Sequence, residues 1–280
     1  MHPEKHRKIR TINEELKSYS TNYLFGGDLK YENIGSYFMD HNFQHVEDEK
    51  VFPSNLSRGK LNYFDSDLYA LLLKKMNSTK EPFLHCAFTG STHSPYDHPK
   101  SKNPRFKGEE ADYMNSMVYA DKCLGDFIAN CKTKPWFKNT IFVFVSDHGH
   151  PAPGLTNPNS KVFFRIPFLI WGEELKDTYR GKINDKIGSQ ADIAATLLYQ
   201  VGGNLKKFPW SKDLLNPSCP EFALLAINRG YGWVSKKGHY VYQMDSKTEL
   251  ENSFLKEDQK EEIKNCNAFL TRFYKDFKDL

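Results

Sequence analysis

The sequence predicts an α/β fold, with a mostly parallel sheet that carries helices on both faces. Short apolar segments alternate along the chain with longer segments that have the apolar spacing of helices. The connections between the apolar segments are long enough for crossover helices, which join parallel strands. The chain has 280 residues, of which 39% are hydrophobic, so it has enough apolar surface for a globular core.

The first half of the chain contains the first expected strands and helices. A strand over residues 23–25 ends at Gly26-Gly27-Asp28, and a helix follows near residues 31–39. The next expected elements are a helix over 65–76, a buried strand over 82–88 and a long helix from 109 to about 131.

Two further strands and one well-marked helix are expected in the second half. The strands span residues 140–145 and 166–171, and Pro167 suits a strand start, a bulge or an edge in the second of them. The helix begins at Ser189-Gln190-Ala191-Asp192, which has capping-box spacing: the serine hydroxyl accepts from the third amide and the carboxylate reaches back. Gly202-Gly203 predicts its end.

The pattern changes from residue 220 onward. The expected elements there are short antiparallel strands and a charged helix, at 222–227, 232–235, 240–244 and 255–277. We interpret residues 1–280 as part of one domain, with an α/β core over 1–219 and an extension of antiparallel strands and a C-terminal helix over 220–280.

Charge and hydropathy support neither a nucleic-acid-binding protein nor a membrane span within this sequence. The chain has 39 basic and 35 acidic residues, and beyond its opening residues the two signs are interleaved, so nothing favours nucleic-acid binding. The longest apolar stretches, such as residues 68–73 and 141–145, are far below the roughly 18 residues of a membrane span. The opening residues lack the apolar region of a secretory signal. None of the five cysteines forms a C-x-x-C spacing, so the cysteines do not decide the compartment.

The strongest candidate for chemistry is the pair Asp147-His148, which directly follows the apolar strand over 140–145. The carboxyl ends of parallel strands border the ligand crevice of such folds. A carboxylate and an imidazole together can bind a divalent cation, because one supplies a hard oxygen and the other a borderline nitrogen. The alternative is a turn in which Asp147 only caps the following backbone.

Other polar loops follow the ends of the expected strands. His93 follows the strand over 82–88 and can donate a hydrogen bond to an anionic oxygen; the alternative is an exposed loop histidine. His150, Lys161 and Arg165 can add positive charge to an anion pocket, or they are solvated loop charges. Gly26-Gly27-Asp28 lets backbone approach a ligand closely, although a simple strand-to-helix turn explains it equally well.

These segments, in this order, resemble the alkaline phosphatase and sulfatase superfamily, and within it the lipoteichoic acid synthase-like branch. The match spans most of the chain, and the order of the segments is more specific than any single one. The segments that carry the resemblance are 23–28 (YLFGGD), 88–96 (FTGSTHSPY), 145–150 (VSDHGH), 165–170 (RIPFLI) and 188–198 (GSQADIAATLL).

The resemblance implies roles for the candidate residues. Asp147 and His148 are expected to ligate a catalytic divalent metal ion, which is Mn, Mg, Zn or Ca. His93 is expected to contact the phosphate or sulfate of the substrate, and His150 is a second expected substrate-binding residue. The substrate implied is a phosphate or sulfate ester, including lipid- and glycan-linked ones.

The family places an acidic metal ligand and a Thr, Ser or modified-Cys nucleophile before the segment at which this sequence starts. Thr11 and Thr21 are the threonines near the start, and neither has the context of that nucleophile. We therefore expect no catalytic nucleophile among these residues, and expect both it and the first strand of the sheet upstream of Met1. The resemblance also implies an extracytoplasmic, membrane-anchored parent protein.

The sequence thus predicts the C-terminal part of a metal-dependent phosphoryl- or sulfuryl-transfer enzyme, which by itself has no turnover. The rival hypothesis is a non-catalytic module that keeps the same crevice and binds anions, glycans or lipid headgroups. An upstream segment with an acidic strand end and a Thr or Ser nucleophile would distinguish the two.

Overall fold

The computed structural model describes residues 3–280, which form two compact units. The first, which we call the parallel-sheet unit, comprises Leu16–Ile141 and Gly172–Glu174. The second, which we call the meander unit, comprises the residues up to Glu15 together with Phe142–Trp171 and Leu175–Leu280.

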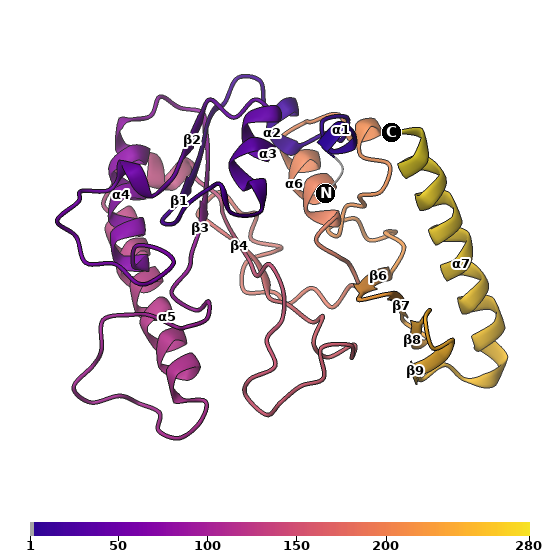
Figure 1. Ribbon diagram of the computed structural model, residues 1–280. Coiled ribbons are helices and arrows are strands. Elements are labelled where there is room, and N and C mark those ends of the chain that lie inside the picture. Colours follow the sequence, from indigo (N-terminus) through magenta and orange to yellow (C-terminus); the bar gives the residue numbers. More distant parts are fainter. Residues whose placement is uncertain (1–2) are drawn as a thin grey trace. The chain divides into compact units, whose positions relative to one another are not determined.

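The sheet of the parallel-sheet unit has three parallel strands in the order β2-β1-β3 (Figure 1). The strands are β1 (Ser20–Phe25), β2 (His45–Glu47) and β3 (Phe83–Phe88). Successive side chains of a strand point to opposite faces, so Tyr23 and Leu24, both buried, contribute to different sides of the sheet.

Helices cover both faces of this sheet, as predicted. A 3-10 turn (Tyr31–Asn33) leads into α3 (Ile34–Asp40), and Phe38 of α3 stacks on Tyr23 with ring centroids 3.6 Å apart. Figure 1 shows the long helices α4 (Asp65–Ser78) and α5 (Ala111–Cys131) on the other side.

The contact between α4 and α5 follows from helical spacing. The buried apolar residues of α4 are four positions apart, as are those of α5: Leu68, Leu72 and Met76, and Cys123, Phe127 and Cys131. Each set forms one stripe along its helix, which explains why the two helices pack together. Two further 3-10 turns, Glu49–Val51 and Pro135–Asn139, lie in the connections of this unit.

The meander unit contains a two-stranded antiparallel pair and a helix. The strands are β4 (Phe142–Val145) and β5 (Phe168–Trp171), and the helix is α6 (Asp192–Gln200). The expected strand over 166–171 begins only after Pro167, as a strand-start proline requires. Shorter helical segments of the unit are α1 (Pro3–His6), α2 (Ile12–Glu15) and a 3-10 turn (Leu205–Lys207).

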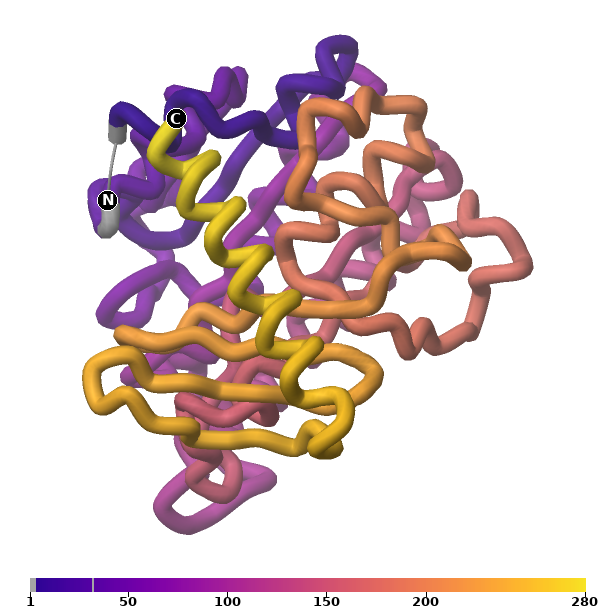
Figure 2. The backbone as a smooth tube through the Cα atoms, turned by 90° about the vertical axis from the view of Figure 1, so that its right-hand side faces the viewer, coloured from indigo at the N-terminus to yellow at the C-terminus, as the bar shows by residue number. Residues whose placement is uncertain are grey.

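Four antiparallel strands and a long helix complete the meander unit. The strands are β6 (Phe222–Ile227), β7 (Gly230–Ser235), β8 (Gly238–Gln243) and β9 (Thr248–Asn252). Figure 2 shows α7 (Lys256–Asp279), in yellow, running across these strands. The core between them contains the buried residues Trp233, Tyr240, Phe254 and Cys266.

The α/β class is confirmed, together with the antiparallel extension and the C-terminal helix. The strands expected over 23–25 and 82–88 are present as the parallel strands β1 and β3. The strands expected over 140–145 and 166–171 as part of a mostly parallel sheet instead pair with each other in antiparallel orientation. Strands β2 and β9 were not predicted. The division of the chain at residue 219 stays a prediction.

The expected capping box before α6 is only half formed. The Asp192 carboxylate reaches back to the Ser189 N–H at 2.7 Å, as predicted. The Asp192 N–H donates to the Ser189 carbonyl at 2.9 Å, and the Ser189 hydroxyl instead donates to the Asp192 carboxylate at 3.4 Å. At the other end, Gly202 has a φ of 76° and the Gly203 N–H donates to the Leu198 carbonyl, so the predicted glycine stop is confirmed.

Candidate metal and anion site

Asp147 and His148 lie in the meander unit just beyond the carboxyl end of β4. The apolar strand pairs with β5 up to Val145, and the chain then turns into solvent. The side chains of Asp147 and His148 are 51% and 64% exposed, so both can reach a ligand.

The two side chains face each other. His148 Nε2 lies 3.4 Å from Asp147 Oδ2, while Asp147 Oδ1 accepts from the His148 N–H at 2.9 Å. His148 Nδ1 lies 2.6 Å from the Gly149 carbonyl oxygen. Because a carbonyl oxygen only accepts, Nδ1 carries the proton, and Nε2 of the neutral ring therefore presents a lone pair beside the carboxylate.

This pair fits a divalent metal ion as two of its ligands. Metal-binding histidines usually donate their other N–H to a carbonyl or carboxylate, as His148 does to Gly149. Two ligands that each lie about 2.1 Å from a tetrahedral ion are about 3.4 Å apart, which matches the observed separation of His148 Nε2 and Asp147 Oδ2. Within residues 3–280, no cluster of three or more acidic, histidine or cysteine side chains could hold a metal. A metal ion held by this pair would therefore take its further ligands from water, substrate or another segment.

Gly149 is required by close backbone contact. A Cβ at this position would lie 1.8 Å from the carbonyl oxygen of Phe163. No flexible side chain can relieve that clash, because the atom belongs to backbone. The glycine of the Asp-His-Gly sequence therefore lets the loop after β4 pack against the segment around Phe163.

Gln190 holds the backbone of the Asp147 loop. Its Nε2 donates to the Ser146 carbonyl at 2.9 Å and to the Asp147 carbonyl at 2.7 Å. Sequence reasoning missed this residue, because its partners are more than 40 positions away. Its one signal was its place inside the capping-box sequence.

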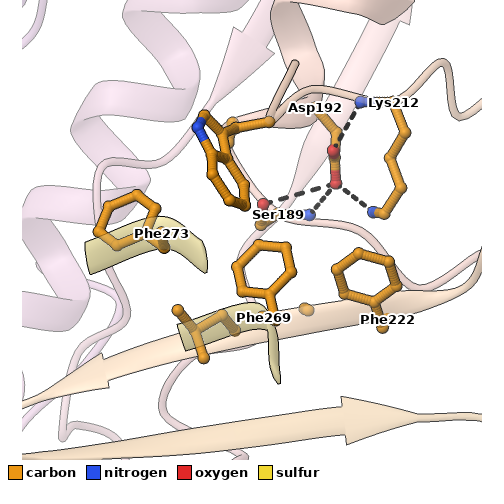
Figure 3. A pocket seen from close by; sticks show the side chains of 10 residues that line it. Ser189, Asp192, Lys212, Phe222, Phe269 and Phe273 are labelled. Carbon is orange, nitrogen blue, oxygen red and sulfur yellow. Dashed lines mark hydrogen bonds and ion pairs between the residues drawn. The ribbon is translucent and has the colours of Figure 1, made fainter. Parts of the chain in front are cut away.

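Asp192 anchors the turn that carries Gln190. Its carboxylate is 1% exposed and accepts from the Lys212 N–H at 3.0 Å and from Lys212 Nζ at 2.5 Å, in addition to Ser189. Figure 3 shows it between Ser189 and Lys212, at a small cavity of about 150 Å³ beside Phe222, Phe269 and Phe273. Both carboxylate oxygens of Asp192 therefore accept hydrogen bonds within the fold, which indicates a structural role.

His150 lies two residues beyond His148. Its Nδ1 lies 3.0 Å from the Ala152 nitrogen and 3.4 Å from the Ala152 carbonyl oxygen, so the ring is held against the backbone of the same loop. Lys161 and Arg165 are exposed positions farther along the same loop region.

His93 lies in the parallel-sheet unit, on the loop after β3, and is exposed. Its Nδ1 lies 2.7 Å from the Ser94 carbonyl oxygen and therefore carries a proton. Its Nε2 can donate to an anion only when the ring is an imidazolium. The structure brings Asp147 and His148 together, His150 follows them two residues along the same loop, and His93 belongs to the other unit.

Asp65 fixes the start of the loop that carries His93. Its Oδ1 accepts from the N–H groups of Gly90 and Ser91 at 3.0 and 3.1 Å, and Ser91 Oγ accepts from the Asp65 N–H at 3.1 Å. Asp65 is the first residue of α4 and is fully buried. Its role was missed because the bonded residues are about 25 positions apart.

Gly26 and Gly27 make room for a neighbouring chain segment. A Cβ on Gly27 would lie 2.7 Å from the Leu61 carbonyl oxygen, and the Gly26 carbonyl accepts from the Tyr63 N–H at 2.8 Å. Asp28 accepts from the Lys30 N–H at 2.9 Å, which is an Asx turn. These contacts favour the simple turn over a ligand-binding backbone.

Comparisons with known proteins identify the family. The sulfatase family model matches residues 2–203 of the chain, which therefore belongs to the sulfatase family. Curated relatives include phosphoglycerol transferase I of Xanthomonas campestris (24% identical, 80% of this chain, 34% of the relative) and the lipoteichoic acid synthase-like protein YvgJ of Bacillus subtilis (24%, 83% and 39%). The chain spans about a third of the length of such relatives.

Solved structures agree with this family. An alkaline phosphatase superfamily protein from Vibrio parahaemolyticus has a TM-score of 0.81 and 25% identity, over 98% of this chain and 70% of that one. The lipoteichoic acid synthase LtaP from Listeria monocytogenes has a TM-score of 0.66 and 20% identity, over 88% and 68%. The resemblance inferred from the motifs is confirmed, and the family's chemistry is phosphoryl or sulfuryl transfer, for which its members generally use divalent metals.

Proposed function

We propose that this chain is the C-terminal, metal-binding part of a metal-dependent phosphoryl- or sulfuryl-transfer enzyme. The observation that carries the proposal is the facing pair Asp147 and His148 at the carboxyl end of β4, with His148 Nε2 3.4 Å from Asp147 Oδ2 and His148 Nδ1 against the Gly149 carbonyl. Membership of the sulfatase family supports it.

Each candidate residue has a role in this proposal. Asp147 and His148 hold the divalent ion, Mn, Mg, Zn or Ca, which when bound polarises the ester and neutralises charge. His150 contacts an oxygen of the phosphate or sulfate. His93, on the loop after β3, is a second residue proposed to contact a phosphate or sulfate oxygen.

The nucleophile in this proposal is a Thr, Ser or modified Cys in a segment that precedes residue 1. The surroundings of both early threonine hydroxyls support this. The Thr11 hydroxyl oxygen is buried just before α2, so it is not open to a substrate. Thr21 is 5% exposed inside β1, and its hydroxyl accepts from the Gln44 N–H at 2.9 Å.

The substrate in this proposal is a phosphate or sulfate ester on a lipid or glycan. The relatives named phosphoglycerol transferase favour a glycerol phosphate group among these esters. We further propose that the whole protein is membrane-anchored and works outside the cytoplasm. Between residues 3 and 280, no helix has the length and apolar character needed to cross a membrane.

Turnover of aryl phosphate and aryl sulfate esters with Mn²⁺ tests the proposal. We expect no turnover by the 280-residue chain and metal-dependent turnover once the upstream segment is joined to it. His148→Ala should abolish that turnover, while His239→Ala, which changes an imidazole on β8, should preserve it.

Two outcomes would contradict the proposal. Metal-dependent hydrolysis by the 280-residue chain alone would mean that it contains a nucleophile. An extended protein that binds the esters without turning them over would favour the rival hypothesis, a non-catalytic binding module.

A further inference from the structure

Glu251 of β9 bonds to the chain segment that follows the candidate metal site, within the meander unit. Glu251 Oε2 accepts from the Lys161 N–H at 3.1 Å, across 90 positions of the sequence. Glu251 lies beyond residues 2–203, which the sulfatase family model matches. The bond therefore joins the C-terminal antiparallel strands to the segment that follows Asp147 and His148.

A β-bulge in β9 decides which face of the sheet Glu251 occupies. Glu251 pairs with Val241 and Glu249 pairs with Tyr242, so Leu250 is an extra residue on β9. Because paired residues share a face and successive residues of β8 alternate, the bulge places Glu251 and Glu249 on opposite faces. Tyr242 packs against the core that α7 covers, so Glu251 lies on the face away from α7.

The segment that Glu251 contacts is wound into consecutive turns. The N–H groups of residues 163, 164 and 165 each donate to the carbonyl three residues earlier, at 3.1 to 3.2 Å. These bonds tie the segment together over residues 160–165. A contact that fixes the Lys161 N–H therefore also fixes the Phe163 carbonyl.

The Phe163 carbonyl lies against the backbone of Gly149. A Cβ on Gly149 would lie 1.8 Å from this oxygen, so no side chain separates the two backbones. The Gly149 carbonyl in turn lies 2.6 Å from Nδ1 of His148 and orients its ring. A shift of the turn that contains Phe163 therefore moves Gly149 and, with it, the His148 ring.

We propose that Glu251 is a positioning residue for the metal-binding pair Asp147 and His148. The inference rests on the metal-binding role proposed above for that pair. His239 Nε2 also lies 3.3 Å from Glu251 Oε2, but the Lys161 N–H needs only an acceptor oxygen. An uncharged side chain of the same length that keeps this oxygen should therefore suffice.

Two measurements on the full 280-residue chain test the proposal: NMR of hydrogen exchange at the His148 amide, which donates to Asp147 Oδ1, and calorimetry of Mn²⁺ binding. Glu251→Ala should speed exchange at Lys161 and His148 and weaken Mn²⁺ binding, each by about fivefold, as expected for one lost hydrogen bond. Glu251→Gln keeps the acceptor and should restore the wild-type values. Faster exchange at Lys161 alone, or no rescue by Glu251→Gln, would overturn the proposal.

Glu249→Ala is the matched control for fraying of β9. It removes a carboxylate on the opposite face of the same strand, which accepts from Asn252 Nδ2 at 2.7 Å. It should leave His148 exchange and Mn²⁺ affinity unchanged, as should His239→Ala, and an effect of either control equal to that of Glu251→Ala would overturn the proposal. If the unaltered chain bound no Mn²⁺, the proposed metal-binding function would be wrong, and His148 exchange would still show whether Glu251 positions that residue.

Discussion

Asp192 and Asp147 belong to the same unit, but their carboxylates differ greatly in burial and in the hydrogen bonds that they accept. Asp192 is buried and accepts hydrogen bonds from two backbone amides and from Lys212 Nζ. Asp147 is half exposed, and its Oδ2 faces the Nε2 of His148 at 3.4 Å. Both aspartates lie in segments that carry the family resemblance, 145–150 and 188–198. Their hydrogen bonds show that Asp192 is a structural carboxylate and that Asp147 is free to bind a ligand.

The two aspartates are nevertheless linked through one turn. Asp192 fixes residues 189–192 to Lys212, and Gln190 of that turn holds the carbonyls of Ser146 and Asp147. The ion pair of the buried Asp192 with Lys212 therefore supports the exposed site through the turn that carries Gln190. This arrangement explains how a solvent-exposed loop can keep a defined geometry.

The largest predicted effect is on stability. Asp192→Ala leaves the partly buried Lys212 ammonium without its partner and also removes the acceptor of two backbone N–H groups, so it should lower the free energy of unfolding by about 3–5 kcal/mol. Asp147→Ala removes an exposed side chain and should change it by less than about 0.5 kcal/mol. Urea unfolding measures both.

A double variant checks the reason for this difference. Asp192→Ala with Lys212→Met removes the unpaired charge and should recover part of the lost stability. Equal effects of Asp192→Ala and Asp147→Ala would contradict the contrast between the two aspartates.

The dependence of stability on acid pH extends the contrast to the partly buried imidazole of His85. Burial lowers the pKa of His85 from 6.5 to about 4, so the unfolded chain takes up a proton before the folded one does. Stability from this group is present above about pH 6.5 and is lost as the pH falls toward 4, by about 2 kcal/mol after allowance for partial exposure. His85→Phe should flatten this part of the stability profile; an unchanged slope in urea unfolding between pH 7 and 4 would refute the assignment.

A smaller effect is expected for the link between the two aspartates. Gln190→Leu removes two hydrogen bonds to the loop and should cost about 1 kcal/mol of stability. It should also weaken metal binding about tenfold, because a supporting contact is lost. Gln200→Leu, an exposed glutamine at the end of α6, is the matched control and should leave metal affinity unchanged.

Local sequence predicted the elements whose apolar pattern is strong. Strand β3 and helices α4, α5 and α7 lie close to their expected ranges because burial imposes strand or helix spacing on their apolar residues. Strand β2 was missed because it has only three residues. Strand β9, with the sequence TELEN, was missed because it is a largely exposed polar edge strand.

The candidate site was predictable only in part, for a related reason. Asp147 and His148 are adjacent and follow an apolar strand, so the local sequence indicates them. Gln190, Lys212 and Asp65 act through hydrogen bonds to residues about 20 to 44 positions away. No pattern in neighbouring residues encodes such bonds, and only the fold brings the partners together.

Calorimetric titration with Mn²⁺ tests the central claim, that Asp147 and His148 form a metal-binding pair. The chain should bind one ion weakly, because only two protein ligands are present in the described residues. Binding should be lost in the Asp147→Ala, His148→Ala double variant and retained in Asp177→Ala, which removes an exposed carboxylate of the same unit. Unchanged Mn²⁺ affinity in the double variant would contradict the claim.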